Sequence, residues 1–175
     1  MKILAISGSG RQASTNTAML KAMAGMAPPQ HQVTLFHGVA DLPVFSPDLE
    51  GRGLPEKVSD FTDLVRDCDG IIIASPEYVR AIPGGLKNAI DWLVSRDEII
   101  GKPIAILHGS HRGDDMLAQL RLVLSTVSDR FSNDIFLRFE LLNLAPHDIA
   151  HELRAPENQH RITAFLQDFT KHCGG

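Results

Sequence analysis

Cysteine is scarce in this 175-residue sequence, which contains only Cys68 and Cys173. Two cysteines cannot build a network of several disulfides or a metal site of four thiolates, and a chain of this length can bury a core without cross-links. We therefore expect a protein of a reducing compartment, the cytoplasm. Cys68 adjoins an apolar run, so we expect a small buried side chain there rather than a nucleophile.

An excess of basic residues is also absent. The 17 Lys and Arg residues are outnumbered by 21 Asp and Glu residues, which gives a formal net charge of -4. Proteins that bind a nucleic-acid backbone normally carry clustered positive charge. We therefore expect no nucleic acid among the partners.

Long hydrophobic runs are missing too. No stretch approaches the roughly 20 apolar residues of a membrane-spanning helix. The apolar run at residues 3–6 is too short for the core of a secretory signal. With no membrane partner expected, and with no repeat or linker to divide the chain, we predict a single domain over residues 1–175.

Short apolar segments alternate with amphipathic ones along the chain. We expect strands at residues 2–7, 32–36, 71–74, 104–108 and within 135–142. We expect helices at residues 12–26, 55–67, 84–94, 116–127 and 155–172, with an irregular connection through Arg52 before the second of them. The run Ile71–Ile73 lacks polar alternation, as in a strand that is covered on both faces. The alternation predicts an α/β fold with a parallel sheet between two layers of helices.

A loop rich in glycine and hydroxyl groups follows the first expected strand and reads G-S-G-R-Q-A-S-T-N over residues 8–16. Ligands of open α/β sheets bind beyond the carboxyl ends of the strands. Backbone N–H groups, a helix N-terminus, hydroxyls and an arginine suit a phosphate, and glycines permit close approach. The alternative is that Ser14 or Thr15 only caps the helix while the glycines form a turn.

The same loop matches the dinucleotide fingerprint G-x-G-x-x-A through Gly8, Gly10 and Ala13. That fingerprint also needs an acidic residue near the end of the second strand, to bind a ribose hydroxyl. His37 stands there instead. A dinucleotide-binding domain without flavin would also leave the next loop unexplained.

The loop after the third strand reads P-E-Y-V-R-A-I-P-G-G-L-K-N-A-I-D-W over residues 76–92. It resembles the P-E-Y-N-x-S-x-P-G-x-L-K-N-A-I-D-W motif of the NAD(P)H-dependent FMN reductases, a flavodoxin-like family that includes quinone, azo-dye and chromate reductases. The first loop is similar to that family's G-S-x-R-x-x-S-x-N segment. Residues 41–45, 48–50, 101–103 and 118–121 resemble further family segments, whereas the chain after Val127 shows no match.

The resemblance implies a flavodoxin-like strand order 2-1-3-4-5, noncovalent FMN, NADPH or NADH as donor, and a small acceptor such as a quinone or a flavin. The residues that it implies for the FMN phosphate are Ser9, Arg11, Ser14, Thr15 and Asn16. Those implied for the flavin ring are Pro76, Glu77, Tyr78 and Val79. Gly109, Ser110, His111 and Arg112 are expected at its edge. Because hydride transfer needs proximity and orientation, we expect no catalytic acid, base or nucleophile from the protein.

The ring loop departs from the family motif at three positions. Val79 replaces the usual Asn, and Arg80-Ala81 replaces a small residue and Ser. Arg80 either brings positive charge to the flavin or to a nicotinamide nucleotide phosphate, or is a solvated surface residue.

Other polar clusters have ordinary alternatives. The family resemblance implies a homodimer or homotetramer, in which Lys87, Asp91 and Trp92 either form an interface or lie on a solvated helix face. Two histidine pairs could suggest a metal: His108 and His111, with Asp114 and Asp115, and His147 with His151. The first pair straddles the end of a strand and the second lies in a proline-containing stretch, so neither offers a prearranged helical face and we expect no metal.

An electron carrier that passes electrons to a protein partner is the rival prediction. Such flavodoxin-like carriers usually have a Thr-rich phosphate loop and a strongly acidic face. Arg11 and a net charge of only -4 disfavour this function.

Overall fold

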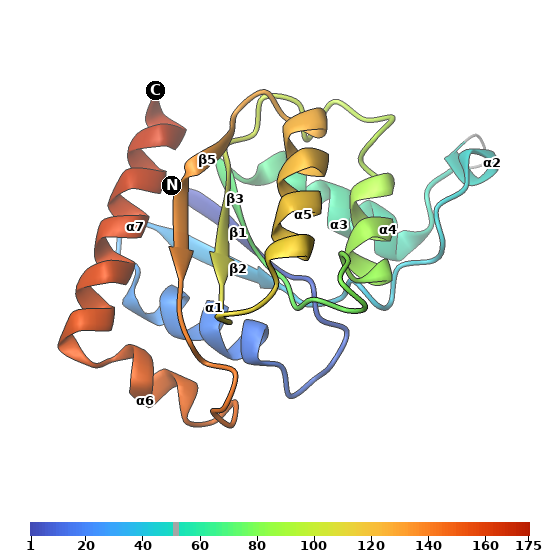
Figure 1. Cartoon of the computed structure of the whole chain (residues 1–175). Coiled ribbons are helices and arrows are strands. Elements are labelled where there is room, and N and C mark those ends of the chain that lie inside the picture. The colour runs from blue at the N-terminus through green and yellow to red at the C-terminus, as the bar shows by residue number, and fades with distance from the viewer. Residues whose placement is uncertain (51–52) are drawn as a thin grey trace.

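The chain forms a five-stranded parallel sheet between two layers of helices (Figure 1). The computed structural model describes residues 1–50 and 53–175. The strands are β1 (Lys2–Ser7), β2 (Gln32–Phe36), β3 (Gly70–Ala74), β4 (Ile104–His108) and β5 (Phe131–Arg138). Their order is β2-β1-β3-β4-β5, and all neighbouring pairs are parallel. The strand order implied by the resemblance is confirmed.

Seven helices are present in the described residues, two more than the sequence predicted. They are α1 (Thr15–Met26), α2 (Pro47–Glu50), α3 (Glu56–Asp67), α4 (Gly84–Asp91), α5 (Asp114–Val127), α6 (Ile149–Leu153) and α7 (Pro156–Gly174). Within residues 1–50 and 53–175, none has the length and apolar character that crossing a bilayer requires. The two unpredicted helices, α2 and α6, are too short to show a helical period in the sequence.

Helix α1 begins at Thr15 rather than at residue 12. Ser14 precedes it with an extended backbone, and its side-chain oxygen accepts a hydrogen bond from the N–H of Thr17 at 3.4 Å. A serine in this position is an N-cap, which satisfies one of the N–H groups that the first turn leaves free. The proposed capping role of Ser14 is therefore real, although it does not exclude anion binding next to it.

Three further boundaries were predicted wrongly. Strand β5 lies at Phe131–Arg138 rather than within 135–142, because exposed Asn133 and Asp134 conceal its first half in the sequence pattern. Helix α4 ends at Asp91 instead of residue 94, and α5 begins at Asp114, two residues before its predicted start. The remaining observed boundaries lie within two residues of the predicted ones. The end of the predicted connection, Arg52, lies outside the described residues.

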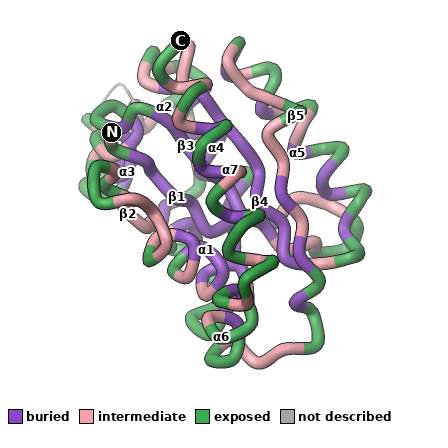
Figure 2. The backbone as a smooth tube through the Cα atoms, turned by 90° about the vertical axis from the view of Figure 1, so that its left-hand side faces the viewer, coloured by how far each residue is buried: buried purple, intermediate pink, exposed green. Residues whose placement is uncertain are grey.

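The two faces of the sheet bury separate apolar clusters, because successive side chains of a strand point to opposite faces. In β1, Leu4 and Ile6 belong to one cluster, whereas Ile3 and Ala5 belong to the other. Helices α3, α4 and α5 cover the first face, and α1, α6 and α7 cover the second. All residues of β3 and β4 are buried, as Figure 2 shows for the centre of the sheet.

Both cysteines lie near the amino end of β3. Cys68 precedes this strand and is buried, as predicted, and a Cβ added at Gly70 would lie 2.5 Å from Sγ of Cys173. Both thiols are free. Burial raises the pKa of Cys68 and raises that of Cys173 to about 11, so both remain protonated at neutral pH.

The predicted interface residues behave differently from one another. Lys87 and Asp91 form an ion pair at 2.5 Å on the partly exposed face of α4. Trp92 is fully buried, packs edge-on against Phe45, and donates from Nε1 to the carbonyl of Pro43 at 2.7 Å. Trp92 therefore offers no surface to a second subunit, and the suggestion that it forms an interface is wrong.

Candidate functional site

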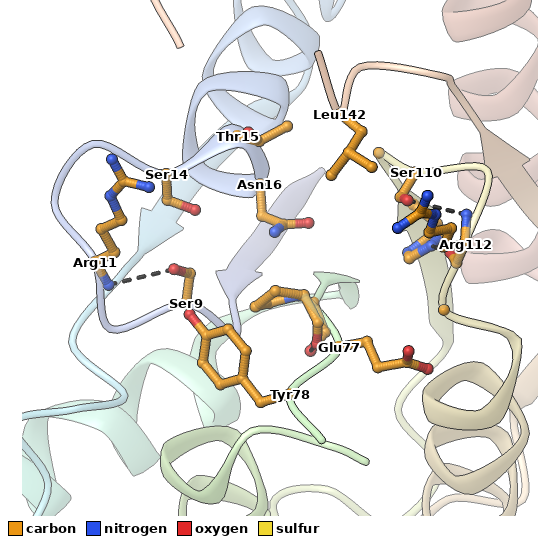
Figure 3. Close-up of a pocket in the computed structure, with 15 residues that line it drawn as sticks. Ser9, Arg11, Ser14, Thr15, Asn16, Glu77, Tyr78, Ser110, Arg112 and Leu142 are labelled. Carbon is orange, nitrogen blue, oxygen red and sulfur yellow. Dashed lines mark hydrogen bonds between the residues drawn. The ribbon is translucent and has the colours of Figure 1, made fainter. Parts of the chain in front are cut away.

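A cavity of about 410 Å³ opens at the carboxyl ends of β1, β3 and β4 (Figure 3). The loops that follow these three strands supply most of its walls. Its lining residues are Ser9, Arg11, Ser14, Thr15, Asn16, Ser75, Pro76, Glu77, Tyr78, His108, Gly109, Ser110, Arg112, Gly113 and Leu142. A volume of several hundred Å³ is typical of a small-ligand site.

The first wall presents hydrogen-bond donors from the loop after β1 and from the start of α1. Ser9, Ser14 and Asn16 are buried, and the Oγ of Ser9 accepts from the N–H of Arg11 at 3.2 Å. Within the described residues, no hydrogen bond engages the backbone N–H of Thr15 or of Asn16. Free N–H groups at a helix N-terminus, with hydroxyls and a guanidinium beside them, fit a phosphate group.

The packing of the protein requires glycine at two positions of this loop. A Cβ at Gly8 would lie 2.8 Å from Cδ2 of Leu86, and one at Gly10 would lie 2.7 Å from Cβ of Ala40. The absence of side chains therefore lets the loop pass close to its neighbouring segments. The expectation that these glycines also allow close approach of an anion stays a prediction.

The loop after β3 folds back on itself in a tight turn. Tyr78 and Ala81 exchange two backbone hydrogen bonds of 3.0 and 3.1 Å, and the two residues between them have positive φ angles. Val79 has φ 52° and a side chain that is almost fully exposed, and Arg80 has φ 59°. Such angles suit Gly or Asn and are strained for a β-branched residue, so this departure from the family motif has a conformational cost.

Three contacts fix this turn to α5. The carboxylate of Glu77 accepts from the N–H of Met116 at 3.1 Å and so caps α5, which has no side-chain cap of its own. The guanidinium of Arg80 pairs with Asp115 at 2.5 Å, and the backbone carbonyl of Arg80 accepts from the side chain of Gln119 at 3.0 Å. Arg80 thus points to a surface carboxylate and does not line the cavity, which favours its interpretation as a solvated residue.

His108 fixes the third loop from inside the protein. Its side chain is 2% exposed, and its Nε2 lies 2.6 Å from the carbonyl oxygen of Arg112, whereas Nδ1 has no hydrogen-bond partner within the described residues. Burial lowers the pKa of this imidazole, so it is neutral and donates from Nε2. Gly113 has φ 100°, and a Cβ there would lie 3.0 Å from the His108 ring.

The cavity gathers most of the residues that the sequence singled out, from three loops far apart in the chain. Eleven of the proposed cofactor contacts line it: Ser9, Arg11, Ser14, Thr15, Asn16, Pro76, Glu77, Tyr78, Gly109, Ser110 and Arg112. Val79 and His111 do not, and both are exposed. Val79 belongs to the turn that supports Tyr78, and His111 lies between two lining residues.

Four lining residues had no assigned role in the site: Ser75, His108, Gly113 and Leu142. The sequence analysis considered His108 only in a possible metal site. Its position at the end of β4 is the signal that could have assigned it to the cavity. Leu142 comes from the segment after β5, where no motif points to the site. This segment is held by two backbone bonds, from the N–H of Phe139 to the carbonyl of His108 at 2.8 Å and from Leu141 to Gly109 at 3.2 Å.

A parallel sheet in this order, with a polar cavity beyond the carboxyl ends of its central strands, defines a flavodoxin-like protein. Comparison with known families makes the assignment specific. The model of the NADPH-dependent FMN reductase family matches residues 1–133, and the chain belongs to this family.

Individual relatives agree with the family. A quinone reductase of Escherichia coli is 34% identical over 109 residues, which are 61% of this chain and 58% of the relative. An NAD(P)H-dependent FMN reductase of Pseudomonas aeruginosa is 38% identical over 112 residues, which are 63% of this chain and 60% of the relative. The chain therefore matches less than two thirds of the length of either protein.

A solved structure extends the likeness over the whole chain. The flavoenzyme NAD(P)H:(acceptor) oxidoreductase FerB of Paracoccus denitrificans is 26% identical, with a TM-score of 0.75 and 98% of each chain covered. The segment after residue 133, which the family model leaves unmatched, therefore has a structural counterpart in a flavoenzyme.

Proposed function

We propose that this protein is an FMN-dependent NAD(P)H oxidoreductase that reduces a small acceptor such as a quinone or a free flavin. The observation that carries the proposal is the cavity itself, in which a phosphate-binding wall and the Tyr78 loop face one space. Membership of the FMN reductase family and the likeness to FerB support it.

The donor set fits FMN in two parts. We assign the phosphate to the hydroxyls of Ser9 and Ser14, the guanidinium of Arg11 and the free N–H groups of Thr15 and Asn16. We assign the isoalloxazine to Pro76, Glu77, Tyr78 and Ser110, whereas Val79 and His111 belong to the same loops without lining the cavity. When bound, FMN supplies the redox chemistry by accepting a hydride from the nicotinamide and passing two electrons to the acceptor.

The side chains have a positioning role in this proposal. Glu77 and His108 are both held by backbone groups, so the loops that carry them keep their shape before a ligand arrives. Preorganised loops reduce the ordering cost of binding and hold the reacting partners in line. No proton needs to be delivered by a protein side chain for hydride transfer.

Binding of FMN is the first test. Purified protein saturated with FMN is expected to show flavin absorbance between roughly 370 and 450 nm and to unfold at a higher temperature, since a ligand of the native state stabilises it. Arg11→Gln should weaken FMN binding about tenfold or more, as expected for the loss of a charge-assisted hydrogen bond. Lys21→Gln, on the exposed side of α1, is the control. Failure of FMN to bind the wild type would refute the proposal.

Reduction by the donor separates an enzyme from an electron carrier. Anaerobic NADPH or NADH is expected to bleach the bound flavin, and a quinone is expected to restore the colour. If donor and acceptor use the same cavity in turn, double-reciprocal plots at several acceptor concentrations should be parallel. A flavin that only a protein partner can reduce would identify the carrier function instead.

Three coarser features complete the proposal. We propose that residues 1–175 form one domain, that the protein acts in the cytoplasm, and that it assembles as a homodimer or homotetramer. The two free thiols support a reducing compartment, and the exposed apolar side chains of Val44 and Ile100 support contact between subunits. Light scattering at several protein concentrations tests the assembly.

A further inference from the structure

Two arginines line the cavity, and they lie on opposite sides of it (Figure 3). Arg11 comes from the loop after β1, and Arg112 comes from the loop after β4. FMN carries one phosphate group, and the wall that contains Arg11 supplies the hydroxyls and the helix N-terminus that fit it. The guanidinium of Arg112 is left over once this phosphate is assigned.

The carboxylates near Arg112 already have other partners. Glu77 accepts from the N–H of Met116 at 3.1 Å. Asp114 pairs with Arg138, and Asp115 pairs with Arg80, each at 2.5 Å. Arg138 also lowers the pKa of the Asp114 carboxyl, which keeps it ionised in this pair.

Arg112 itself has no such partner. Throughout residues 1–50 and 53–175, its guanidinium takes part in no ion pair and no hydrogen bond. Because the carboxylates that are close to it in the chain are paired elsewhere, this guanidinium is available to an anion that enters the cavity.

The backbone of Arg112 is fixed on both sides. Its N–H donates to the Oγ of Ser110 at 3.0 Å, and its carbonyl accepts from the buried His108 at 2.6 Å. The side chain therefore starts from a defined point on the cavity wall. A ligand that binds it has to order only the side chain and not the loop, which lowers the cost of binding.

We propose that Arg112 forms a second anion subsite, which binds a phosphate group of the nicotinamide donor. This inference rests on the proposed function. Both NADH and NADPH carry a pyrophosphate, and NADPH has an additional phosphate on the adenosine ribose. The planar guanidinium can bind either group through two parallel hydrogen bonds.

The test compares Arg112→Gln with the wild type and with Arg154→Gln. Arg154 is the control, because it is an exposed arginine at the end of α6 and does not line the cavity. FMN affinity is measured by flavin fluorescence, and kcat/KM is measured separately for donor and acceptor. Binding of ADP-ribose and of its 2′-phosphorylated form to the FMN-saturated and FMN-free proteins is measured by calorimetry.

Arg112→Gln is expected to lower kcat/KM for the donor about 10- to 100-fold, as for the loss of a charge-assisted hydrogen bond to a phosphate. The same variant should weaken binding of the matching ADP-ribose compound by a similar factor. Its affinity for FMN and its kcat/KM for a quinone should change less than about twofold, as should every value for Arg154→Gln. A loss with NADPH alone assigns Arg112 to the 2′-phosphate, and a loss with both donors assigns it to the pyrophosphate.

Three results would overturn the inference. The first is that Arg112→Gln leaves both the donor kcat/KM and the ADP-ribose affinity unchanged. The second is that the variant loses FMN affinity instead, and the third is that it loses kcat/KM for the acceptor instead. Failure of the wild type to bind FMN or to oxidise either donor would instead refute the proposed function. The calorimetric comparison of wild type with Arg112→Gln still decides the subsite in that case.

Discussion

At the scale of single residues, Val79 stands out because its backbone lies in the left-handed region, with φ 52°. A β-branched side chain is strained there, whereas asparagine tolerates the conformation. Val79→Asn should therefore raise the free energy of unfolding by about 1 kcal/mol. Val94→Asn, at another exposed valine without a positive φ, should change it by less than about 0.5 kcal/mol. Urea unfolding of both variants measures this, and equal effects would contradict the strain argument.

The buried His108 makes a prediction about pH. Because burial lowers its pKa, the folded protein resists a proton that the unfolded chain accepts below about pH 6.5. This imidazole contributes full stability above that pH, and its contribution falls as the pH decreases. His108→Gln, which keeps a donor for the carbonyl of Arg112, should reduce the loss of stability between pH 7 and pH 5.

Two variants complete this test. His108→Leu leaves the carbonyl of Arg112 without this donor and should cost about 1 kcal/mol at pH 7. His111→Gln, in the exposed part of the same loop, should keep the wild-type dependence on pH. If the stability of His108→Gln depended on pH as that of the wild type does, the buried ring would not control this dependence.

The sequence predicted the site at this scale because its motifs are local. The loop after β1 and the turn at Tyr78 each lie within one short stretch, so their residues could be named before the fold was known. The place of Leu142 depends on contacts between segments far apart in the chain, such as the hydrogen bond from the N–H of Leu141 to the carbonyl of Gly109. Such pairings are set by the fold and leave no spacing in the sequence.

At the scale of elements, Glu98 connects α3 to the segment before β4. Its side chain is 11% exposed and accepts from Arg96 at 2.5 Å and from Arg66 of α3 at 2.9 Å. Arg96 and Arg66 lower the pKa of Glu98 to about 2. Glu98→Gln should lower the free energy of unfolding at pH 7 by about 1–2 kcal/mol.

The dependence of this effect on pH identifies its cause. A carboxyl whose pKa is lowered by folding stabilises the protein above its unfolded pKa, and this contribution is lost as the pH falls toward about 2. The difference between wild type and Glu98→Gln should therefore shrink below about pH 4.5. Asp63→Asn removes the exposed partner of the same Arg66 and should cost less than about 0.5 kcal/mol. A difference that stays constant down to pH 3 would exclude the ion pairs.

Most elements could be predicted because the buried strands are uninterrupted apolar runs and the long helices have one apolar face. The failures have local causes. The polar pair Asn133-Asp134 concealed the start of β5, and the cap at Ser14 moved the start of α1. Short elements such as α6 contain too few residues for a period to be visible.

At the scale of the whole molecule, the segment beyond the family match completes the core. Helices α6 and α7 cover the second face of the sheet with Ile149, Leu153, Ile162 and Phe165, all of them buried. A chain that ends at residue 133 should therefore lack a cooperative thermal transition, because this face would be open to water. A chain that ends at Cys173 loses only two exposed glycines and should unfold like the wild type. Circular dichroism measures both, and cooperative unfolding of the shorter chain would show a separate domain.

The position of the two thiols has a consequence for the chemical durability of the protein. A reduced flavin exposed to air also passes electrons to dioxygen, and hydrogen peroxide is then released where the flavin is bound. Cys68 and Cys173 lie near the amino end of β3, whereas the cavity lies beyond the carboxyl ends of the strands. Because peroxide attacks the thiolate and both pKa values are raised, we expect the two thiols to resist the by-product that the proposed reaction would release.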